Sequence, residues 1–413
     1  MRTGAKRFQP QQQQGTQLRV LSMSSQTQSG YGRNAIVPAE DAALTRVGFG
    51  TPMGELLRRY WHPVCLSAEL GELPKFLRIL GEELVAYRDR SGRVGVLGAH
   101  CCHRGTSLEY GRIEENGLRC CYHGWLFNAE GRCLEQPGEP PDSTYNERVS
   151  QPWYPAEEYH GLVFVYMGPL ERKPLLPHYD TLEQESAGHV AYRNHSRGDV
   201  VRCNWLQLQE NAIDPIHTFA LHGYNPGVFG FTDIYSILPE IDYSRHDHSI
   251  TYERDALLPG DRNFLRVVEA FVPNVRSIPP PVVEGKDPEK ETERARMIGW
   301  WVPVDDENTV GFHIEAVSPD RPMFQPTGPI PDRPYEETQR TPDDREAQVS
   351  QRPIAIHALE HLATSDRGVI MFRRLLRECS RMVENGDDPP GVNRDPTKRV
   401  IESKARNAVS LAE

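Results

Sequence analysis

The sequence predicts an α+β protein in which a small all-β domain precedes a larger domain that combines strands with helices. Short apolar runs separated by turn residues fill residues 58–170, which is typical of β structure. After residue 180, runs of helix length occur together with neighbouring runs of strand length. The 413 residues are enough for two or three domains, so both regions fit in one chain.

Changes in composition divide the chain into three segments. Residues 1–38 are rich in Gln and Ser and contain no Asp or Glu. We therefore predict a disordered tail over residues 1–40, with an acid-poor organellar transit peptide as the alternative. Residues 41–170 are predicted to form the β domain together with a leading helix. Residues 171–413 are predicted to form the second domain.

Each element of the β domain has a local signal. A helix is expected over residues 51–64, where apolar residues recur at helical spacing. Strands are expected where β-branched and aromatic residues gather, with turns at Asp89–Gly92 and Asn116–Gly117 between them. These strand-like runs are residues 75–89, 94–100, 118–128 and 161–168.

The second domain contains two long helical runs and a pair of strand-like runs. The helices are expected over residues 203–222 and 367–386, the second ending at Gly386. Residues 297–304 and 309–317 are predicted to pair as strands. Two polar, Pro-containing or charged stretches, residues 284–296 and 325–344, are expected to be exposed loops.

Composition and charge exclude several classes of protein. A net charge of −11 disfavours a nucleic-acid-binding protein, and no run reaches the roughly 18 to 20 apolar residues of a membrane span. Eight cysteines in 413 residues do not make a disulfide framework. Four of them lie between Cys101 and Cys121, which indicates metal or redox chemistry in a reducing compartment. A cytoplasmic location is therefore expected.

The clustered cysteines alternate with histidines. Cys101-x-His103 and Cys120-x-x-His123 are separated by sixteen residues, enough for a strand, a turn and a strand. Two Cys and two His can bind zinc or a [2Fe–2S] cluster of the Rieske type, in which two His replace two Cys on one iron. Structural zinc sites usually present Cys-Cys and His-His groups, so the alternating order favours the Rieske cluster. Zinc is the alternative.

Two further cysteines, Cys102 and Cys121, each follow a predicted ligand directly. We expect that neither binds the cluster. The alternative is that the two thiols pair with each other.

A second group of possible ligands lies in the predicted helix over residues 203–222. Asp214-x-x-His217 spans about one helical turn, whereas His217-x4-His222 fits one helix face only if the helix contains a π-turn or a local break. Two His and one carboxylate form the facial triad of non-haem Fe(II) oxygenases, which leaves positions open for O₂ and substrate. The predicted carboxylate is Asp366, at the start of the last helix; the alternative is that Asp366 only caps that helix. Asn211, one turn before Asp214, is a weaker candidate for a residue near the iron.

The stretch "CCHRGTSLEYG…LRCCYHGWLF" resembles the N-terminal Rieske domain of the large (alpha) subunits of aromatic ring-hydroxylating oxygenases. "YWHPVCLSAEL" and "SDRGVIMFRRLLRE" are most similar to the phthalate-dioxygenase-like branch, and the resemblance covers about residues 45–400. The family most often has proline at the positions of Cys102 and Cys121, so this chain departs from its pattern there. The resemblance implies a Rieske domain followed by a catalytic domain with an antiparallel sheet and helices, similar to a helix-grip fold.

The resemblance also implies roles for individual residues. Cys101 and Cys120 would bind one iron of the [2Fe–2S] cluster, and His103 and His123 the other. The mononuclear Fe(II) would be bound by His217, His222 and Asp366. Asp214 would connect this centre to His123 of a neighbouring subunit, which implies a homotrimer.

The implied function is that of the terminal oxygenase component of a multicomponent enzyme. It would use O₂ and electrons from a separate flavin and iron–sulfur reductase to hydroxylate a small aromatic compound, with an aryl carboxylate of the phthalate or phenoxybenzoate kind preferred. NAD(P)H would act only through that reductase, since no Gly-x-Gly-x-x-Gly motif opens a βαβ unit here. The cation for a substrate carboxylate would come from Arg202, Arg262, Arg266 or Arg276.

Three other functions remain open at this point. One is an O-demethylase or monooxygenase acting on a methoxybenzoate such as vanillate. Another is a Rieske electron carrier without oxygenase activity. The third is a zinc-stabilised binding protein.

Overall fold

The computed structural model describes residues 39–183, 188–193, 200–223, 233–258, 261–282, 293–319, 323 and 333–411. The residues described from Ala39 onward belong to one compact unit. The predicted tail therefore lies almost wholly outside the described residues. No helix in these ranges is both long enough and apolar enough to cross a membrane.

Antiparallel strands are the main regular structure of the first part of the compact unit, as predicted. β2, β3, β4 and β9 form one sheet, β5 to β8 form a second, and β1, β11 and β10 form a third. Their bounds are β1 Trp61–Leu66, β2 Lys75–Ile79, β3 Glu82–Arg88, β4 Val94–Gly98, β5 Arg112–Glu114, β6 Gly117–Arg119, β7 Leu126–Phe127, β8 Cys133–Glu135, β9 Trp153–Tyr154, β10 Ala156–Tyr159 and β11 Leu162–Tyr166.

The leading helix is shorter than the sequence predicts. α3 covers Pro52–Leu57 and is capped by the Thr51 side chain, which accepts a hydrogen bond from the Gly54 N–H. The prediction that the helix continues to residue 64 is wrong, because β1 begins at Trp61 and pairs with β11. Pro63 could not have donated the hydrogen bond that a helix interior requires. The short helix α2, Ala42–Thr45, precedes α3.

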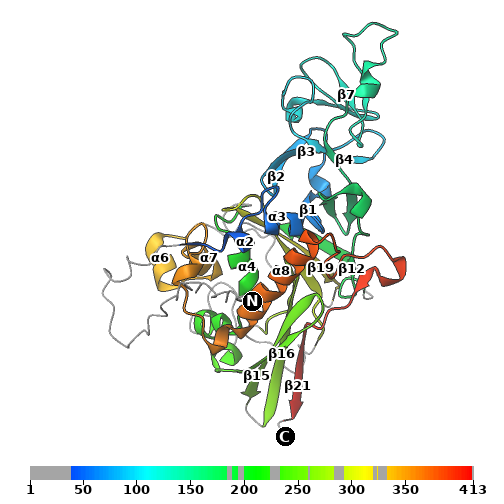
Figure 1. Cartoon of the computed structure of the whole chain (residues 1–413). Coiled ribbons are helices and arrows are strands. Elements are labelled where there is room, and N and C mark those ends of the chain that lie inside the picture. The colour runs from blue at the N-terminus through cyan, green and yellow to red at the C-terminus, as the bar shows by residue number, and fades with distance from the viewer. Residues whose placement is uncertain are drawn as a thin grey trace, which may run out of the picture. The chain divides into compact units, whose positions relative to one another are not determined.

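The second part is built on an eight-stranded antiparallel sheet, counted over the described residues. The strand order is β13-β19-β18-β17-β16-β15-β14, and β21 also pairs with β16. In Figure 1, β15, β16 and β21 lie side by side as long neighbouring arrows. The bounds are β13 Gly188–Arg193, β14 Glu240–Arg245, β15 Ser249–Leu258, β16 Arg262–Phe271, β17 Val275–Ser277, β18 Met297–Pro303, β19 Thr309–Val317 and β21 Arg406–Leu411; β12 His178–Tyr179 and β20 Val400–Ile401 form a separate pair.

The predicted helices of this part are present, together with two that were not predicted. β18 and β19 pair as predicted, and α8, Arg367–Glu384, ends just before Gly386, whose φ is +84°. The interpretation of residues 325–344 as loop is wrong at its end, because α6, Tyr335–Arg340, and the start of α7, Asp344–Val349, lie there. α4, Trp205–Asn211, and α5, Pro215–His217, occupy the predicted helix over residues 203–222.

Strand pairing in the described residues follows the predicted boundary near residue 170, but the apolar core continues across it. One cluster of buried side chains contains Leu84 and Phe164 from the first part and Trp300 and Phe372 from the second. The rings of Phe164 and Trp300 meet edge to face at 5.4 Å between centroids. The two parts are therefore joined by buried apolar surface as well as by the chain itself.

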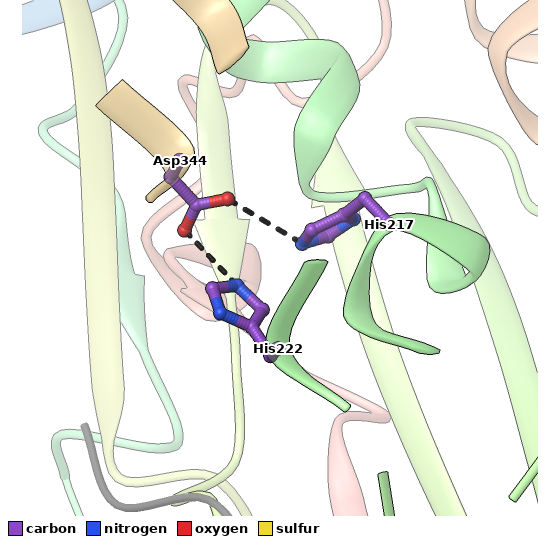
Figure 2. A group of neighbouring side chains, drawn as sticks. All are labelled: His217, His222 and Asp344. Atoms are coloured by element: carbon purple, nitrogen blue, oxygen red, sulfur yellow. Dashed lines mark ion pairs between the residues drawn. The ribbon is translucent and has the colours of Figure 1, made fainter. Parts of the chain in front are cut away.

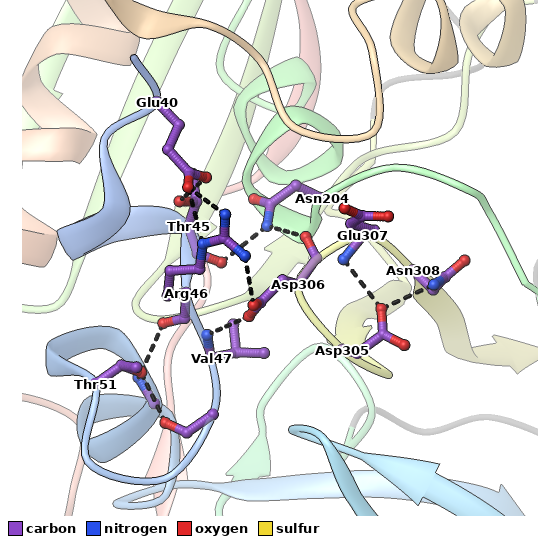
Figure 3. A network of polar contacts seen from close by, with 12 residues as sticks. Glu40, Thr45, Arg46, Val47, Thr51, Asn204, Asp305, Asp306, Glu307 and Asn308 are labelled. Atoms are coloured by element: carbon purple, nitrogen blue, oxygen red, sulfur yellow. Dashed lines mark hydrogen bonds and ion pairs between the residues drawn. The ribbon is translucent and has the colours of Figure 1, made fainter.

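Polar contacts around the turn between β18 and β19 also join the two parts (Figure 3). Asp306 accepts a hydrogen bond from the Val47 N–H and forms an ion pair with Arg46. The Asn204 side-chain amide donates to the backbone oxygens of Thr45 and Asp306, at 2.9 and 2.7 Å. Asn204 is the N-cap of α4, so the segment before α3 contacts the helix that leads to the candidate ligands.

Candidate active site with two groups of metal ligands

The first group of candidate metal ligands lies on two tight loops, one that leaves the sheet of β2, β3, β4 and β9 and one within the sheet of β5 to β8. One loop follows β4 and carries Cys101 and His103; the other connects β6 to β7 and carries Cys120 and His123. Each loop closes with a hydrogen bond from a glycine N–H, from Gly105 to the Cys101 oxygen and from Gly124 to the Cys120 oxygen. Both glycines have positive φ, +77° and +74°, a conformation that residues with a Cβ adopt at a cost.

The four predicted cluster ligands come together on these loops. Cys101 and Cys120 are each only 3% exposed, and the rings of His103 and His123 are 4.5 Å apart between centroids. His103 stacks on Trp125 at 4.3 Å, and its buried Nδ1 has no protein hydrogen-bond partner. Two buried thiols and two adjacent imidazoles, one with an unpartnered nitrogen, fit the ligand set of a Rieske cluster.

Cys102 and Cys121 are both exposed. The Cys102 thiol nevertheless lies within hydrogen-bond reach of the Cys101 thiol, and this contact lowers the pKa of Cys102. The backbone N–H of Cys102 donates to the Gln151 side chain at 2.7 Å. Gln151 in turn donates to the backbone oxygens of Gly98 and His100, and so fixes the base of the first loop. This buried glutamine carries no sequence signal that could have identified it. All eight cysteines lie in the described residues and none forms a disulfide, which excludes the pairing alternative in this state.

The second group is positioned by an irregular helix. Asp214 caps α5, accepting hydrogen bonds from the N–H groups of Ile216 and His217 at 2.9 and 3.2 Å, and Pro215 occupies the first helical position. The next turn, η5, is π-helical over Thr218–His222, and the Gly223 N–H donates to the Thr218 oxygen at 3.0 Å. The π-turn expected from the five-residue step is therefore present.

Both histidines face one carboxylate (Figure 2). His217 Nε2 lies 3.8 Å from one oxygen of Asp344, and His222 Nε2 lies 3.3 Å from the other. One ligand atom from each of the three residues falls within 4.8 Å of the other two, an arrangement that could hold a metal ion. His217 donates its Nδ1 proton to the Asp214 carbonyl, so its Nε2 lone pair points toward Asp344.

The electrostatic environment keeps Asp344 ionised. Burial raises the pKa of this carboxyl, but the hydrogen bond from His222, the attraction of His217 and His222 when their rings are protonated, and the Asn211 amide outweigh it and lower the pKa to about 2. Asn211 Nδ2 donates to Asp344 Oδ1 at 3.1 Å. Asn211 therefore lies beside this candidate centre, as the sequence predicted. Two imidazoles and one ionised carboxylate fit a mononuclear Fe(II) site.

The structure does not bring Asp366 into this group, which corrects the predicted ligand set. Asp366 ends a short 3₁₀ turn, Thr364–Asp366, and its carboxylate accepts a hydrogen bond from the Ala363 N–H at 2.6 Å. Asp344 takes the predicted place of Asp366. Both residues begin helices, so helix-start signals alone could not separate them. The capping box that Asp343 and Glu346 form around Asp344 marks the start of α7, but it is also a helix-start signal and does not identify a metal ligand.

The four arginines proposed for substrate binding occupy different environments. Arg202 is exposed and Arg262 is half-buried. Arg266 is buried, and it donates to the Pro279 and Pro280 oxygens and to Asn407. Arg276 is buried beside His313, and Nη2 of Arg276 lies 2.7 Å from His313 Nε2.

Comparison with known proteins agrees with this geometry. Residues 60–154 match the Rieske [2Fe–2S] domain family. The chain is 41% identical over 381 residues to the phenoxybenzoate dioxygenase subunit alpha of Ectopseudomonas oleovorans, covering 89% of this chain and 91% of that protein. It is 43% identical over 365 residues to the tert-butanol monooxygenase / tert-amyl alcohol desaturase oxygenase subunit of Aquincola tertiaricarbonis, covering 81% and 75% of the two chains.

Solved structures show the same fold at lower identity. The NdmA QL mutant of Pseudomonas putida CBB5 with caffeine aligns with a TM-score of 0.61 and 21% identity, covering 81% of this chain and 94% of that one. Dicamba monooxygenase bound to dicamba aligns with a TM-score of 0.59 and 18% identity, covering 80% and 99%. The domain match and the named oxygenase subunits imply one Rieske [2Fe–2S] cluster and one mononuclear iron as cofactors. The chain thus belongs to the Rieske non-haem iron oxygenases, among the oxygenase (alpha) subunits of the phthalate-dioxygenase-like branch.

Proposed function

We propose that this chain is the terminal oxygenase of a multicomponent system that hydroxylates an aryl carboxylate of the phenoxybenzoate or phthalate kind. The observation that carries the proposal is the His217–His222–Asp344 group, in a chain 41% identical to a phenoxybenzoate dioxygenase subunit along most of its length. Other relatives support an aromatic acid, since they include the oxygenase subunits of 3-chlorobenzoate-3,4-dioxygenase and phthalate 4,5-dioxygenase.

The proposal assigns each ligand. Cys101 and Cys120 would hold one iron of the cluster and His103 and His123 the other. His217, His222 and Asp344 would hold the mononuclear iron. When bound, the cluster supplies electrons one at a time and the mononuclear iron supplies the centre at which O₂ is activated. The protein's own part is to hold the His217 proton on Nδ1 against the Asp214 carbonyl, and to keep Asp344 ionised through Asn211.

Asp214 is proposed to connect this centre with His123 of a neighbouring subunit in a homotrimer. Its side chain is 35% exposed, so a carboxylate oxygen remains accessible while it caps α5. His123 is also on an accessible loop. A separate reductase carrying flavin and iron–sulfur groups would supply electrons from NAD(P)H. A reducing compartment such as the cytoplasm is supported by eight cysteines without a disulfide.

A second candidate function is monooxygenation. The 43% identity to a tert-butanol monooxygenase and 34% identity to the 5,5'-dehydrodivanillate O-demethylase oxygenase subunit of Sphingobium sp. favour it. Labelling with ¹⁸O₂ separates the two reactions, because a dioxygenase places both atoms of one O₂ in the product and a monooxygenase places one.

The test is a single turnover by anaerobically purified protein, which needs no reductase. The protein is expected to contain about three irons and two sulfides per chain and to give a Rieske-type EPR signal after reduction. The reduced protein is then mixed with O₂ and 3-phenoxybenzoate, phthalate, 3-chlorobenzoate or tert-butanol. Hydroxylated aromatic acid is the expected product. Zinc without sulfide, or product from tert-butanol alone, would contradict the proposal.

Replacing Asn211 with Ala is expected to weaken retention of the mononuclear iron by about 10- to 100-fold, the usual effect of losing a hydrogen bond to a metal ligand. The Asp344 carboxylate would lose the donor 3.1 Å away and turn more freely. Dialysis against a chelator, followed by iron analysis, measures the loss. Asn211→Asp serves as a contrast, because it keeps the shape and removes the donor. Equal iron retention in wild type and both variants would argue against the role of this amide.

A further inference from the structure

A buried row of side chains crosses four strands of the large sheet. The register pairs Arg276 of β17 with Gly299 of β18, Gly299 with His313 of β19, and His313 with Tyr192 of β13. Residues paired directly across strands place their side chains on the same face. A Cβ at Gly299 would lie 2.7 Å from the His313 ring and 3.3 Å from Arg276 Nε. The missing side chain therefore leaves the space in which Arg276 and His313 meet.

Arg276 is a buried cation in this row. It is 6% exposed, its guanidinium carbon lies 4.0 Å from the centre of the Trp301 ring, and its Nη2 donates to His313 Nε2 at 2.7 Å. Burial lowers the pKa of Arg276 to about 9, while Tyr192 and Asp344 oppose the shift, so the group stays charged at neutral pH. Burial and the arginine's charge hold the pKa of His313 well below its usual range, so this ring is neutral.

Two donors of this pair have no protein partner. His313 accepts through Nε2, so its proton resides on Nδ1, and that atom is buried without a hydrogen bond. Arg276 Nη1 is likewise buried and without a partner. Among the described residues, no carboxylate forms an ion pair with Arg276. A buried charge that lacks a counter-ion is costly, so this arrangement indicates a site that receives an anion.

The row faces the elements that carry the mononuclear centre. Trp301 packs with Val201, Cys203 and Leu208, and with Val349 at the edge of that cluster. Leu208 belongs to α4, which also carries Asn211, and Val349 belongs to α7, which begins at Asp344. The Asp344 oxygens themselves face His217 and His222. The unpartnered cation is thus on the iron side of the sheet.

Another buried arginine offers a comparison. Arg254 also has two unpartnered atoms, Nε and Nη1, and its Nη2 donates to the oxygens of Ile234 and Ile237. Packing distinguishes Arg276, because its guanidinium lies over Trp301, and Trp301 packs against Leu208 of α4 and Val349 of α7.

We propose that Arg276 binds the carboxylate of the aromatic substrate through Nη1, and that His313 positions the guanidinium for it. The proposal rests on the proposed function and deepens it, since it assigns the residue that selects an anionic over a neutral substrate. A guanidinium suits a carboxylate because its donors form a planar fork. His313 acts only through Arg276 and is a positioning residue.

The test compares two probes that differ at one ring substituent, a carboxylate in 3-phenoxybenzoate and an uncharged methyl group in 3-phenoxytoluene. Their Kd values are measured calorimetrically with anaerobic holoenzyme of the wild type and of Arg276→Met, which keeps length and apolar volume. The Kd for the acid is expected to rise about 10- to 100-fold, the range for a lost charge-assisted hydrogen bond, and the Kd for the neutral probe to change less than about 3-fold. Iron content and the cluster spectrum report whether the variant is intact.

Two further variants complete the design. Arg276→Lys keeps the positive charge and is expected to recover part of the affinity for the acid. Arg245→Met removes an exposed arginine that is paired with Glu378 and is expected to behave as wild type. An equal loss of affinity for both probes in Arg276→Met would indicate a structural role for Arg276 and overturn the proposal. If the wild type oxygenates the acid but Arg276→Met binds the acid as tightly as the wild type does, only this inference is overturned. Activity of the wild type on neutral compounds only would overturn the proposed function as well.

Discussion

Asp344→Ala is expected to abolish oxygenation and to remove one of about three irons per chain, while the Rieske EPR signal is retained. The reason is that Asp344 supplies the only carboxylate that lies between His217 and His222 in the described part of the chain. Two imidazoles alone would leave a weaker, less specific site. Iron and sulfide analysis together with a single turnover measures both effects. Product loss should exceed about 100-fold, more than losing a hydrogen bond to a ligand usually costs.

Asp366→Ala is the matched control, because it removes a carboxylate from another helix start. Its side chain accepts from the Ala363 N–H, so the expected cost is that of one lost hydrogen bond, about 1 kcal/mol of stability, with iron retained. The two variants decide between the ligand predicted from sequence and the one found in the structure. Loss of iron in Asp366→Ala, with retention in Asp344→Ala, would reverse the assignment.

Arg373→Met is expected to destabilise the fold by about 3 to 5 kcal/mol, the usual cost of removing one partner from a buried ion pair. Arg373 on α8 forms ion pairs with two carboxylates, those of Glu210 on α4 and of Glu360. The side chains of Arg373 and Glu210 are 12% and 14% exposed, and that of Glu360 is 26% exposed. Chemical denaturation followed by circular dichroism measures the change.

The loss of folding stability in Arg373→Met is expected to be greater at pH 8 than at pH 5.5. Burial raises the pKa of Glu210 and the charge of Arg373 opposes that shift, so the pKa of Glu210 should rise further in the variant. A carboxyl whose folded pKa is raised destabilises the fold above that pKa, and protonation at lower pH removes the penalty. Arg245→Met is the control: its pair with Glu378 is exposed on both sides and should contribute at most about 1 kcal/mol. An equal effect of the two substitutions would contradict the analysis.

The sequence predicted the candidate ligands whose spacing is local. Cys101, His103, Cys120 and His123 lie on loops of a few residues, so their types and spacing limit the geometry strongly. The same holds for His217 and His222, where the five-residue step called for a π-turn or a local break and the structure has a π-turn, η5. The two-part organisation and the β18–β19 pair were also predictable from local patterns.

The third ligand could not be predicted from spacing, because a residue more than a hundred positions away reaches the histidines only through the tertiary fold. Asp344 and Asp366 both follow helix-start patterns, and only the packing of α7 beside α4 and η5 selects the first. Arg276 illustrates the same limit. Its significance depends on the cross-strand register that places Gly299 between Arg276 and His313, and this register is not visible along the sequence.

The turn between β18 and β19 has a consequence for building hybrid enzymes. Asp306 and Asn204 in the second part bind Thr45, Arg46 and Val47, and the N–H groups of Leu80 and Gly81 donate to the oxygens of Pro303 and Val304, both at 2.9 Å. A chimera that exchanges residues 41–170 with those of a relative therefore replaces one side of this junction and leaves the other. Functional hybrids should require the donor's own counterpart of residues 303–308 to be transplanted with its cluster domain.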